Sequence, residues 1–485
     1  MAHSREFVTG SGSRMSVTTF TPTSAQQHIA TVERTCVPPI RRSPPRLRRL
    51  TAGDAAAAIA GIGGGVVVGS GWVMSAETWS TPGGPLTVLG TLAALLGTYL
   101  CLVLIIIVAR VPWLEHDVGQ DRLIALHRRL APWAVGLISA HVLATTWGYA
   151  QAAGVRLWSQ FVALVTGYPW MVPATVAFIA MLALSLSSIR AVRQRLAYES
   201  WWVAHLYFYL AVALAFGHQL TSGALFTTYP WARVGWIALY ICVAAVVLGS
   251  RVILPLVRSA RYSYRVAEVT TDCPGVVDVT ITGRHLDRLP VCGGQFFEWR
   301  FLTRHWWWQA HPYSLSRGPD GRSLRITVKA LGDQSAAIGR LRPGTRVIAE
   351  GPYGIFTAGH RAGGESVVAI AAGVGVAPVK SMLDTLGPSD DVTVIYRVPD
   401  LNPHSIALRD EIEAVVCANR WRLVYVPGDP DACTMTAESL QQLAPSAARA
   451  DIFVCGPQGF TDTVLDAAHD LGVAPARIHH ELFTF

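Results

Sequence analysis

Charge is scarce in this chain of 485 residues: only 15% of the residues are Asp, Glu, Lys or Arg, whereas 51% are hydrophobic. A soluble protein of this length rarely has so few charges, so the sequence predicts several domains, with a membrane region joined to a soluble one. Lysine is nearly missing, because only Lys329 and Lys380 stand among the 40 basic residues. The arginines lie beside apolar segments, so membrane orientation explains the net charge of +8 better than nucleic-acid binding does.

Cysteine motifs are also missing, because the eight cysteines form no Cys-x-x-Cys pair and no ferredoxin-like spacing. Neither a zinc site nor an iron–sulfur centre is indicated, and we expect reduced thiols. No internal repeat stands out. A signal peptide is not expected, because the first apolar segment begins about fifty residues into the chain. Residues 1–50 are polar, end in a basic run, and are predicted to be a disordered tail.

Long apolar runs fill residues 51–257 and predict a bundle of six transmembrane helices, since about 20 residues cross a bilayer core of about 30 Å. The expected spans are 53–74, 86–110, 125–150, 168–190, 201–223 and 232–256, with a short interfacial segment at 157–167. Arginines gather before span one, between spans two and three, after span four and after span six. Cytoplasmic loops collect Lys and Arg, so we expect a plasma-membrane protein with both termini in the cytoplasm.

The sequence pattern changes after the last span. Short strand-like runs predict an antiparallel β-barrel over residues 262–357. From 365 to 485, apolar strands alternate with helical stretches, which is typical of a parallel α/β domain. The fold class is therefore multidomain, with a membrane bundle followed by a barrel and an α/β domain.

Four histidines lie inside two of the spans: His127 and His141 in span three, His205 and His218 in span five. Ionisable residues inside a membrane are costly and indicate function. Each pair is about 20 Å apart along its helix, and the two spans run in the same direction. We therefore expect His127 to face His205 near the cytosol and His141 to face His218 near the outer side. Two facing imidazoles suit the axial positions of a haem iron and favour electron transfer.

The spacing of the second pair is imperfect, because thirteen residues leave His218 about 140° from His205 on an ideal helix. We expect helix tilt or a π-type irregularity near Gly217 to correct the aim. Isolated packing histidines, a proton path or a zinc site are the other interpretations.

One run in the barrel segment suits a flavin: His311, Pro312, Tyr313 and Ser314. An aromatic ring can flank the flavin ring system while a serine hydroxyl or a main-chain N–H hydrogen-bonds its edge. A plain His-Pro turn leading into a strand is the alternative.

Two glycine-containing turns suit phosphates. Gly332 and Ser335 precede a helix-like stretch whose free N–H groups could meet a pyrophosphate, although an ordinary capped helix has the same pattern. Gly373, Gly375 and Pro378 follow an apolar strand, where glycine lets the backbone approach a phosphate closely and proline suits a first helical turn.

Three further positions follow strand ends. Arg397 could hold the 2′-phosphate of NADPH or be a surface charge. Cys455, before Gly456 and Pro457, could lie near a nicotinamide ring or be an ordinary buried cysteine before a turn. Phe485 could stack on a flavin or belong to a packed or frayed tail.

Together and in this order, the four histidines, the His-Pro-Tyr-Ser-Leu run, the Gly-x-Gly-x-x-Pro turn, the Cys-Gly-Pro turn and the terminal Phe resemble the ferric reductase and NADPH oxidase superfamily. The resemblance spans residues 51–485 and implies a haem-binding membrane domain at 51–257. A ferredoxin-reductase-like module would follow, with an FAD-binding barrel at 262–357 and an NAD(P)-binding domain at 365–485. Two b-type haems, FAD and NADPH or NADH are the implied cofactors.

The resemblance also assigns residues. The haem ligands would be His127, His141, His205 and His218. FAD would meet His311, Pro312, Tyr313, Ser314, Gly332 and Ser335. The dinucleotide would meet Gly373, Gly375, Pro378, Arg397, Cys455, Gly456 and Pro457. Ser314, Cys455 and Phe485 would be the catalytic residues.

One position departs from the family's pattern. An aromatic residue found six positions after the first span-five histidine in some oxidases is Ala211 here. An aromatic relay between the haems is therefore doubtful at that position, although Phe208 or Tyr207 could replace it.

The expected function is electron transfer from cytosolic NAD(P)H through FAD and two haems to a small acceptor outside the membrane, foremost a ferric chelate. Two alternatives stay open: one-electron reduction of oxygen to superoxide, and donation of electrons to a partner protein or to quinone. Besides the acceptor, the expected partners are the bilayer and the nicotinamide dinucleotide, and no nucleic acid.

Overall fold

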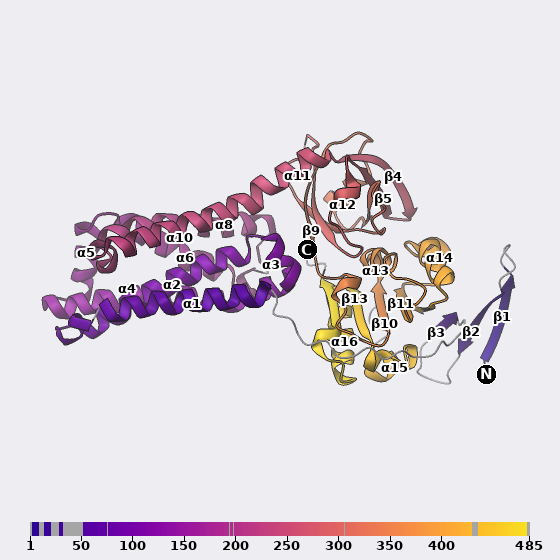
Figure 1. Ribbon diagram of the computed structural model, residues 1–485, viewed down its shortest axis with the longest axis horizontal. Helices are drawn as coiled ribbons and strands as arrows, with labels where there is room; N and C mark the ends of the chain where they lie inside the picture. The colour runs from indigo at the N-terminus through magenta and orange to yellow at the C-terminus, as the bar shows by residue number, and fades with distance from the viewer. Residues whose placement is uncertain are drawn as a thin grey trace. The chain divides into compact units, whose positions relative to one another are not determined.

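The computed structural model describes residues 2–8, 14–20, 29–32, 52–74, 76–193, 195–196, 198–304, 306–428 and 435–482. The chain divides into two compact units, which we call the helical unit and the sheet unit (Figure 1). The helical unit is Leu50–Val252, and the sheet unit is Ile253–Phe485 together with Met1–Arg49.

Apolar helices make up the helical unit, as the long hydrophobic runs predict. Its helices are α1 (Ala52–Met74), α2 (Gly84–Ile107), α3 (Pro112–Val118), α4 (Gln120–Ala153), α5 (Leu157–Gly167), α6 (Met171–Ser187), α7 (Arg190–Arg193), α8 (Tyr198–Ser222), α9 (Ala224–Thr228) and α10 (Pro230–Leu248). Helix α10 continues through a π turn at Gly249–Ile253 into α11 (Leu254–Tyr262).

Within the described residues, four helices are long and apolar enough to cross a membrane: Gly84–Ile107, Arg122–Ala153, Ser200–Ser222 and Pro230–Tyr262. Helices α5 and α6 pass the same test only together, and they are bent by 118°. The apolar part of α1, Ala56–Trp72, is shorter. The structure thus supports four or five spans of the predicted six. The first span remains a prediction. The fourth span is supported only together with α5, and the break between α5 and α6 falls where the sequence analysis separates 157–167 from the span at 168–190.

Small residues let the central helices of the bundle pack closely. A Cβ atom added to Gly90 of α2 would lie 2.6 Å from Cγ2 of Thr145 on α4. One added to Gly97 would lie 3.0 Å from Cδ1 of Ile138. Close approach of this kind is how membrane helices gain packing energy without a hydrophobic driving force.

Two antiparallel sheets stand where the sequence predicts a barrel. One has the order β4 (Arg265–Cys273), β5 (Val276–Thr282), β8 (Ser323–Lys329), and the other β7 (His311–Ser314), β6 (Phe296–Phe301), β9 (Val347–Tyr353). Single bridges join the sheets, at Arg265 with Arg346 and at Leu315 with Ile326. Alternate residues of β6, among them Phe297 and Trp299, are buried in a shared core, as the period of a half-buried strand requires.

A parallel sheet follows, with the order β12-β11-β10-β13-β14. Its strands are β10 (Val367–Ala372), β11 (Val392–Val398), β12 (Arg422–Pro427), β13 (Asp451–Gly456) and β14 (Ile478–Leu482). Helices α13 (Val376–Leu383) and α14 (Arg409–Asn419) pack on one face, and α15 (Ala437–Leu443) and α16 (Gln458–Asp470) pack on the other. Every residue of β10 is buried, as expected for a strand covered on both faces.

The N-terminal tail contains three strands where the sequence predicts disorder: β1 (Ala2–Val8), β2 (Arg14–Phe20) and β3 (Ile29–Val32). Strand β3 pairs antiparallel to β12 at the edge of the parallel sheet. The rest of the predicted tail, including 33–50, lies outside the described residues.

Candidate functional site

The inner histidine pair meets inside the helical unit. The ring centroids of His127 on α4 and His205 on α8 are 6.2 Å apart, and their planes are inclined by 66°. A metal–imidazole bond is about 2 Å long and the ring centre lies about 1 Å further, so two imidazoles on opposite sides of one metal have centroids about 6 Å apart. The observed separation therefore fits two axial ligands of one iron.

The hydrogen bonds of the ring nitrogens differ among the four histidines. The Nδ1 atoms of His127, His205 and His218 are buried, and none of them makes a hydrogen bond of normal geometry within the described residues. On His141, Nδ1 lies 3.0 Å from the carbonyl oxygen of Gly90. A carbonyl only accepts, so Nδ1 donates and Nε2 is left as the ligand atom, as is common for metal-binding histidines.

His141 and His218, the second predicted pair, lie on the same two helices as the first pair, α4 and α8. The predicted π irregularity near Gly217 is wrong, because α8 is regular over Tyr198–Ser222 and the π turn lies in the next long helix instead. Gly217 has another role: a Cβ atom there would lie 2.6 Å from Cδ2 of Trp170. The glycine therefore makes room for the indole ring. The facing of His141 and His218, with helix tilt as its cause, stays a prediction.

Phe208 lies inside the bundle beside His205, whereas Tyr207 is exposed. The Phe208 ring centroid is 5.0 Å from that of His205, and Phe208 packs against the buried Ala211. Tyr207 is 54% exposed and points away from the bundle. Phe208 and Tyr207 are the two residues that could replace an aromatic residue at position 211. Of these two, only Phe208 lies inside the bundle.

The predicted flavin run forms strand β7 in the sheet unit. Ser314 is buried, and its Oγ donates a hydrogen bond of 3.1 Å to Oε1 of Glu481 on β14. Tyr313 stacks loosely on His311, with ring centroids 6.2 Å apart, and Pro312 is exposed. Burial raises the pKa of Tyr313, so its hydroxyl stays protonated at neutral pH.

Cys455 also contacts Glu481, through the main chain of the glutamate rather than its side chain. Its Sγ is 3.5 Å from the main-chain oxygen of Glu481, because β13 and β14 pair in parallel with these two residues in register. Ser314 and Cys455, which the sequence places in different domains, thus converge on Glu481. Sequence reasoning missed this glutamate. The available signal was an acidic residue in an apolar C-terminal strand, two positions before an aromatic residue.

The glycine turn lies beside Cys455 at the carboxyl end of the parallel sheet. Gly373 has a φ of +55°, and no atom lies within 4 Å of a Cβ added there. A Cβ on Gly375, in contrast, would lie 2.3 Å from the carbonyl oxygen of Cys455. Pro378 sits in the first turn of α13. The first glycine therefore opens space for a ligand, and the second lets the turn approach Cys455.

The Cys-Gly-Pro turn completes this edge of the sheet. A Cβ on Gly456 would lie 2.9 Å from Cβ of Ala372, and Pro457 is the N-cap of α16. Ligands of open α/β sheets bind at the carboxyl ends of the strands, where these turns meet.

Ser335 and Arg397, two of the predicted site residues, contact other parts of the protein in the structure. The Ser335 hydroxyl accepts from the main-chain N–H groups of Leu331 and Gly332, so it caps its own short helix, α12 (Asp333–Ile338). Arg397 is not a surface charge, because it is only 8% exposed and its guanidinium lies 5.6 Å from the ring centroid of Phe460. Phe485 lies outside the described residues.

Two family models match the chain, one in each unit. Residues 93–216 match the ferric reductase like transmembrane component, and residues 369–466 match the oxidoreductase NAD-binding domain. The first match contains His127, His141 and His205, and the second contains the glycine turn and Cys455. Their order confirms the predicted resemblance to the ferric-reductase-like superfamily.

Curated relatives match the part of the chain that forms the reductase-like module. The flavohemoprotein of Vibrio cholerae is 31% identical over 183 residues, covering 35% of this chain and 45% of that protein. The ferredoxin reductase component of the 3-ketosteroid-9-alpha-monooxygenase of Rhodococcus rhodochrous is 26% identical over 228 residues, covering 45% and 63%. The chain thus spans about half the length of the curated relatives it matches.

Among solved structures, the flavohem-like FAD/NAD-binding domain of nitric oxide dioxygenase from Vibrio cholerae has a TM-score of 0.36 and 21% identity. It covers 46% of this chain and 99% of that one. A ferredoxin NADP+ reductase from Neisseria gonorrhoeae, solved with FAD and NADP, has a TM-score of 0.38 and 18% identity, and covers 46% and 99%.

The family models and the curated relatives define the class of the protein as an NAD(P)H-dependent oxidoreductase. More particularly, the chain joins a segment that matches a ferric-reductase-like transmembrane component to a segment that matches an oxidoreductase NAD-binding domain.

Proposed function

We propose that this protein carries electrons from cytosolic NADPH or NADH through FAD and two b-type haems to an acceptor on the outer side of the plasma membrane, and that this acceptor is a ferric chelate. The observation that carries the proposal is the 6.2 Å separation of the His127 and His205 rings on two apolar helices. A haem iron held by these two imidazoles would account for that distance.

The histidines have one role, to hold iron. His127 with His205 would bind the inner haem, and His141 with His218 would bind the outer one. Iron held by two imidazoles from the protein would suit electron transfer rather than oxygen binding at the metal.

The sheet unit has the residues to bring a dinucleotide and a flavin together. Tyr313 and Ser314 would contact the flavin, while Gly373 and Cys455 would contact the dinucleotide. When bound, these cofactors supply hydride transfer and its division into single electrons, which needs no acid or base from the protein. The protein contributes position. Glu481 contacts both Ser314 and Cys455 and so fixes their geometry.

The proposed orientation rests on arginine. Arg190, Arg193 and Arg195 follow α6, and Arg258 and Arg261 lie in α11, at the end of the last long helix. Arginines concentrate in cytoplasmic loops, so this distribution supports a cytosolic sheet unit and an outer acceptor.

The purified full chain in lipid nanodiscs, loaded with FAD and kept free of oxygen, tests the proposal. Adding NADPH or NADH should reduce the haems, and a ferric chelate added afterwards should reoxidise them as Fe²⁺ forms. Flavin that is reduced while the haems stay oxidised would contradict the proposed path. Haems that ferric chelate leaves reduced, but oxygen reoxidises as superoxide forms, would overturn the proposed acceptor only.

A further inference from the structure

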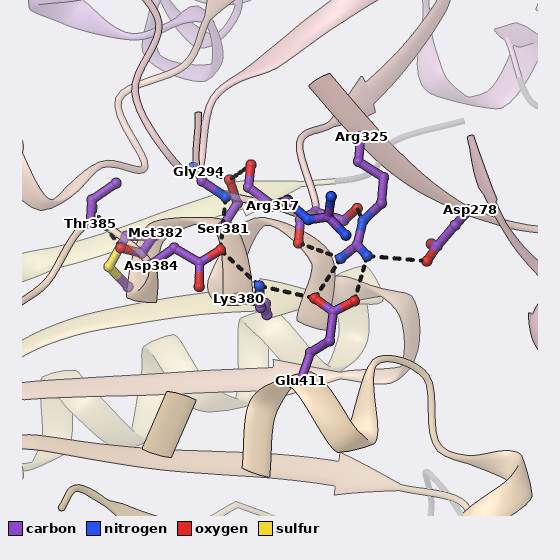
Figure 2. Close-up of polar contacts among 12 residues, drawn as sticks. Asp278, Gly294, Arg317, Arg325, Lys380, Ser381, Met382, Asp384, Thr385 and Glu411 are labelled. Atoms are coloured by element: carbon purple, nitrogen blue, oxygen red, sulfur yellow. Dashed lines mark hydrogen bonds and ion pairs between the residues drawn. The ribbon is translucent and has the colours of Figure 1, made fainter. Parts of the chain in front are cut away.

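A group of charges around two buried basic side chains joins the barrel to the dinucleotide domain (Figure 2). Arg325 of β8 and Lys380 of α13 are 4% and 6% exposed, and both bind Glu411 of α14. Oε2 of Glu411 lies 2.7 Å from Nη2 of Arg325 and 3.0 Å from Nζ of Lys380. Lys380 also binds Asp384 at 2.8 Å, and Arg325 lies 3.5 Å from Asp278. We call these five residues the charge cluster.

The Glu411 carboxylate at the centre of the charge cluster remains ionised at physiological pH. Burial alone would raise the pKa of the Glu411 carboxyl, but hydrogen bonds from Arg325 and Lys380 hold it at about 2. Buried ion pairs often contribute little net stability, because desolvation offsets their attraction. A better-attested effect of buried ion pairs is to favour one arrangement of the segments that carry them.

Helix α13 sits unusually close to the barrel at the same place. A Cβ on Gly293 would lie 1.9 Å from the carbonyl oxygen of Ser381, and one on Gly318 would lie 2.6 Å from Cβ of Asp384. Oγ of Ser381 donates to the carbonyl oxygen of Arg317 at 3.0 Å and accepts from the N–H of Gly294 at 3.2 Å. The backbone of the barrel, rather than its side chains, forms the surface on which α13 rests.

This contact connects the two cofactor-binding segments. At its start, α13 follows directly on the Gly373–Gly375 turn, where the dinucleotide would bind. One turn later it contacts Arg317 and Gly318, which follow the flavin run by three and four residues. A shift of α13 on the barrel therefore changes the position of the dinucleotide turn relative to the flavin strand.

Lys380 is the charged member that α13 itself contributes. All eight residues of this helix are buried, so a lysine among them requires partners. Resting on the proposed function above, we propose that Lys380 is a positioning residue for hydride transfer. By binding Glu411 and Asp384, its ammonium holds α13 in the one placement that brings the nicotinamide within reach of the flavin.

The test replaces Lys380 by methionine, which keeps the length of the side chain and removes the charge. Glu411 keeps Arg325 as a partner, so the fold should survive. Stopped-flow reduction of the bound flavin by NADPH and by NADH separates the limiting rate from the apparent Kd. We expect the limiting rate to fall about 10- to 100-fold, because a misplacement of about 1 Å has effects of this size. The Kd should change less than about threefold, and a dinucleotide deuterated at C4 should show a larger isotope effect.

The conservative variant Lys380→Arg should recover much of the rate. Arg409→Gln is the matched control, because it removes an ion pair of 2.8 Å with Glu413 elsewhere on α14 and should leave the rate unchanged. Glu411→Gln should mimic Lys380→Met, and the double variant should lose less than the sum of the two in free-energy terms, since the residues act as a pair.

Three outcomes separate the hypotheses. If flavin in the unchanged protein is not reduced by either dinucleotide, the proposed function itself is wrong. If flavin in the unchanged protein is reduced, and Lys380→Met reacts at the same limiting rate per bound flavin, the positioning role is overturned. Should Lys380→Met fail to fold, Glu411→Gln decides: a normal limiting rate in that variant also overturns the role.

Discussion

His141→Ala should lower the haem content from two per chain to one and stop electron flow to the outer acceptor. Its ring is oriented by the Gly90 carbonyl, which leaves Nε2 to bind iron, and alanine supplies no ligand. The inner pair, His127 and His205, is untouched. Acceptor reduction should therefore fall by at least about 100-fold, since even changes to residues that only orient a metal ligand have effects of about 10- to 100-fold. Flavin reduction by the dinucleotide should keep its rate.

The reciprocal variant distinguishes the two levels. His127→Ala should remove the inner haem, so that no haem is reduced by the flavin although the outer one is still bound. His116→Ala, which changes an exposed histidine of the same unit on α3, is the control and should retain both haems. Full haem content in both His141→Ala and His127→Ala would show that the ligand assignment is wrong.

Ser314→Ala should slow reduction of the flavin by about 10- to 100-fold while leaving the haems bound. The hydroxyl is buried and donates its one proton to Glu481, so its oxygen is held in a fixed direction and would meet the flavin as a hydrogen-bond acceptor. Rapid-mixing absorbance of the flavin band measures this rate. Ser323→Ala is the control, because that hydroxyl only binds Asp320 in an exposed turn. An unchanged rate in Ser314→Ala would remove Ser314 from the catalytic residues.

Sequence patterns predicted the structure correctly where the position of a residue depends on its own helix or strand. The shared direction of spans three and five predicted that His127 and His205 would face each other, and their rings are 6.2 Å apart. The alternation of apolar strands and helices predicted the parallel sheet, because each strand buries both faces.

Sequence patterns failed where distant segments meet. The role of Gly217 follows from its contact with Trp170, which comes from an earlier segment of the chain, and no local pattern shows that contact. Glu481 and Lys380 were missed because most of their partners are distant in the sequence. Apart from the contact of Lys380 with Asp384, the partners lie between 26 and 167 residues away.

Haem content of the purified, unchanged protein tests the central claim most directly. The account predicts two low-spin b-type haems per chain, with an absorption spectrum typical of two imidazole ligands on each iron. A preparation that is folded and binds FAD, yet holds no haem or only one, would contradict it. So would a spectrum showing an iron with an open ligand position.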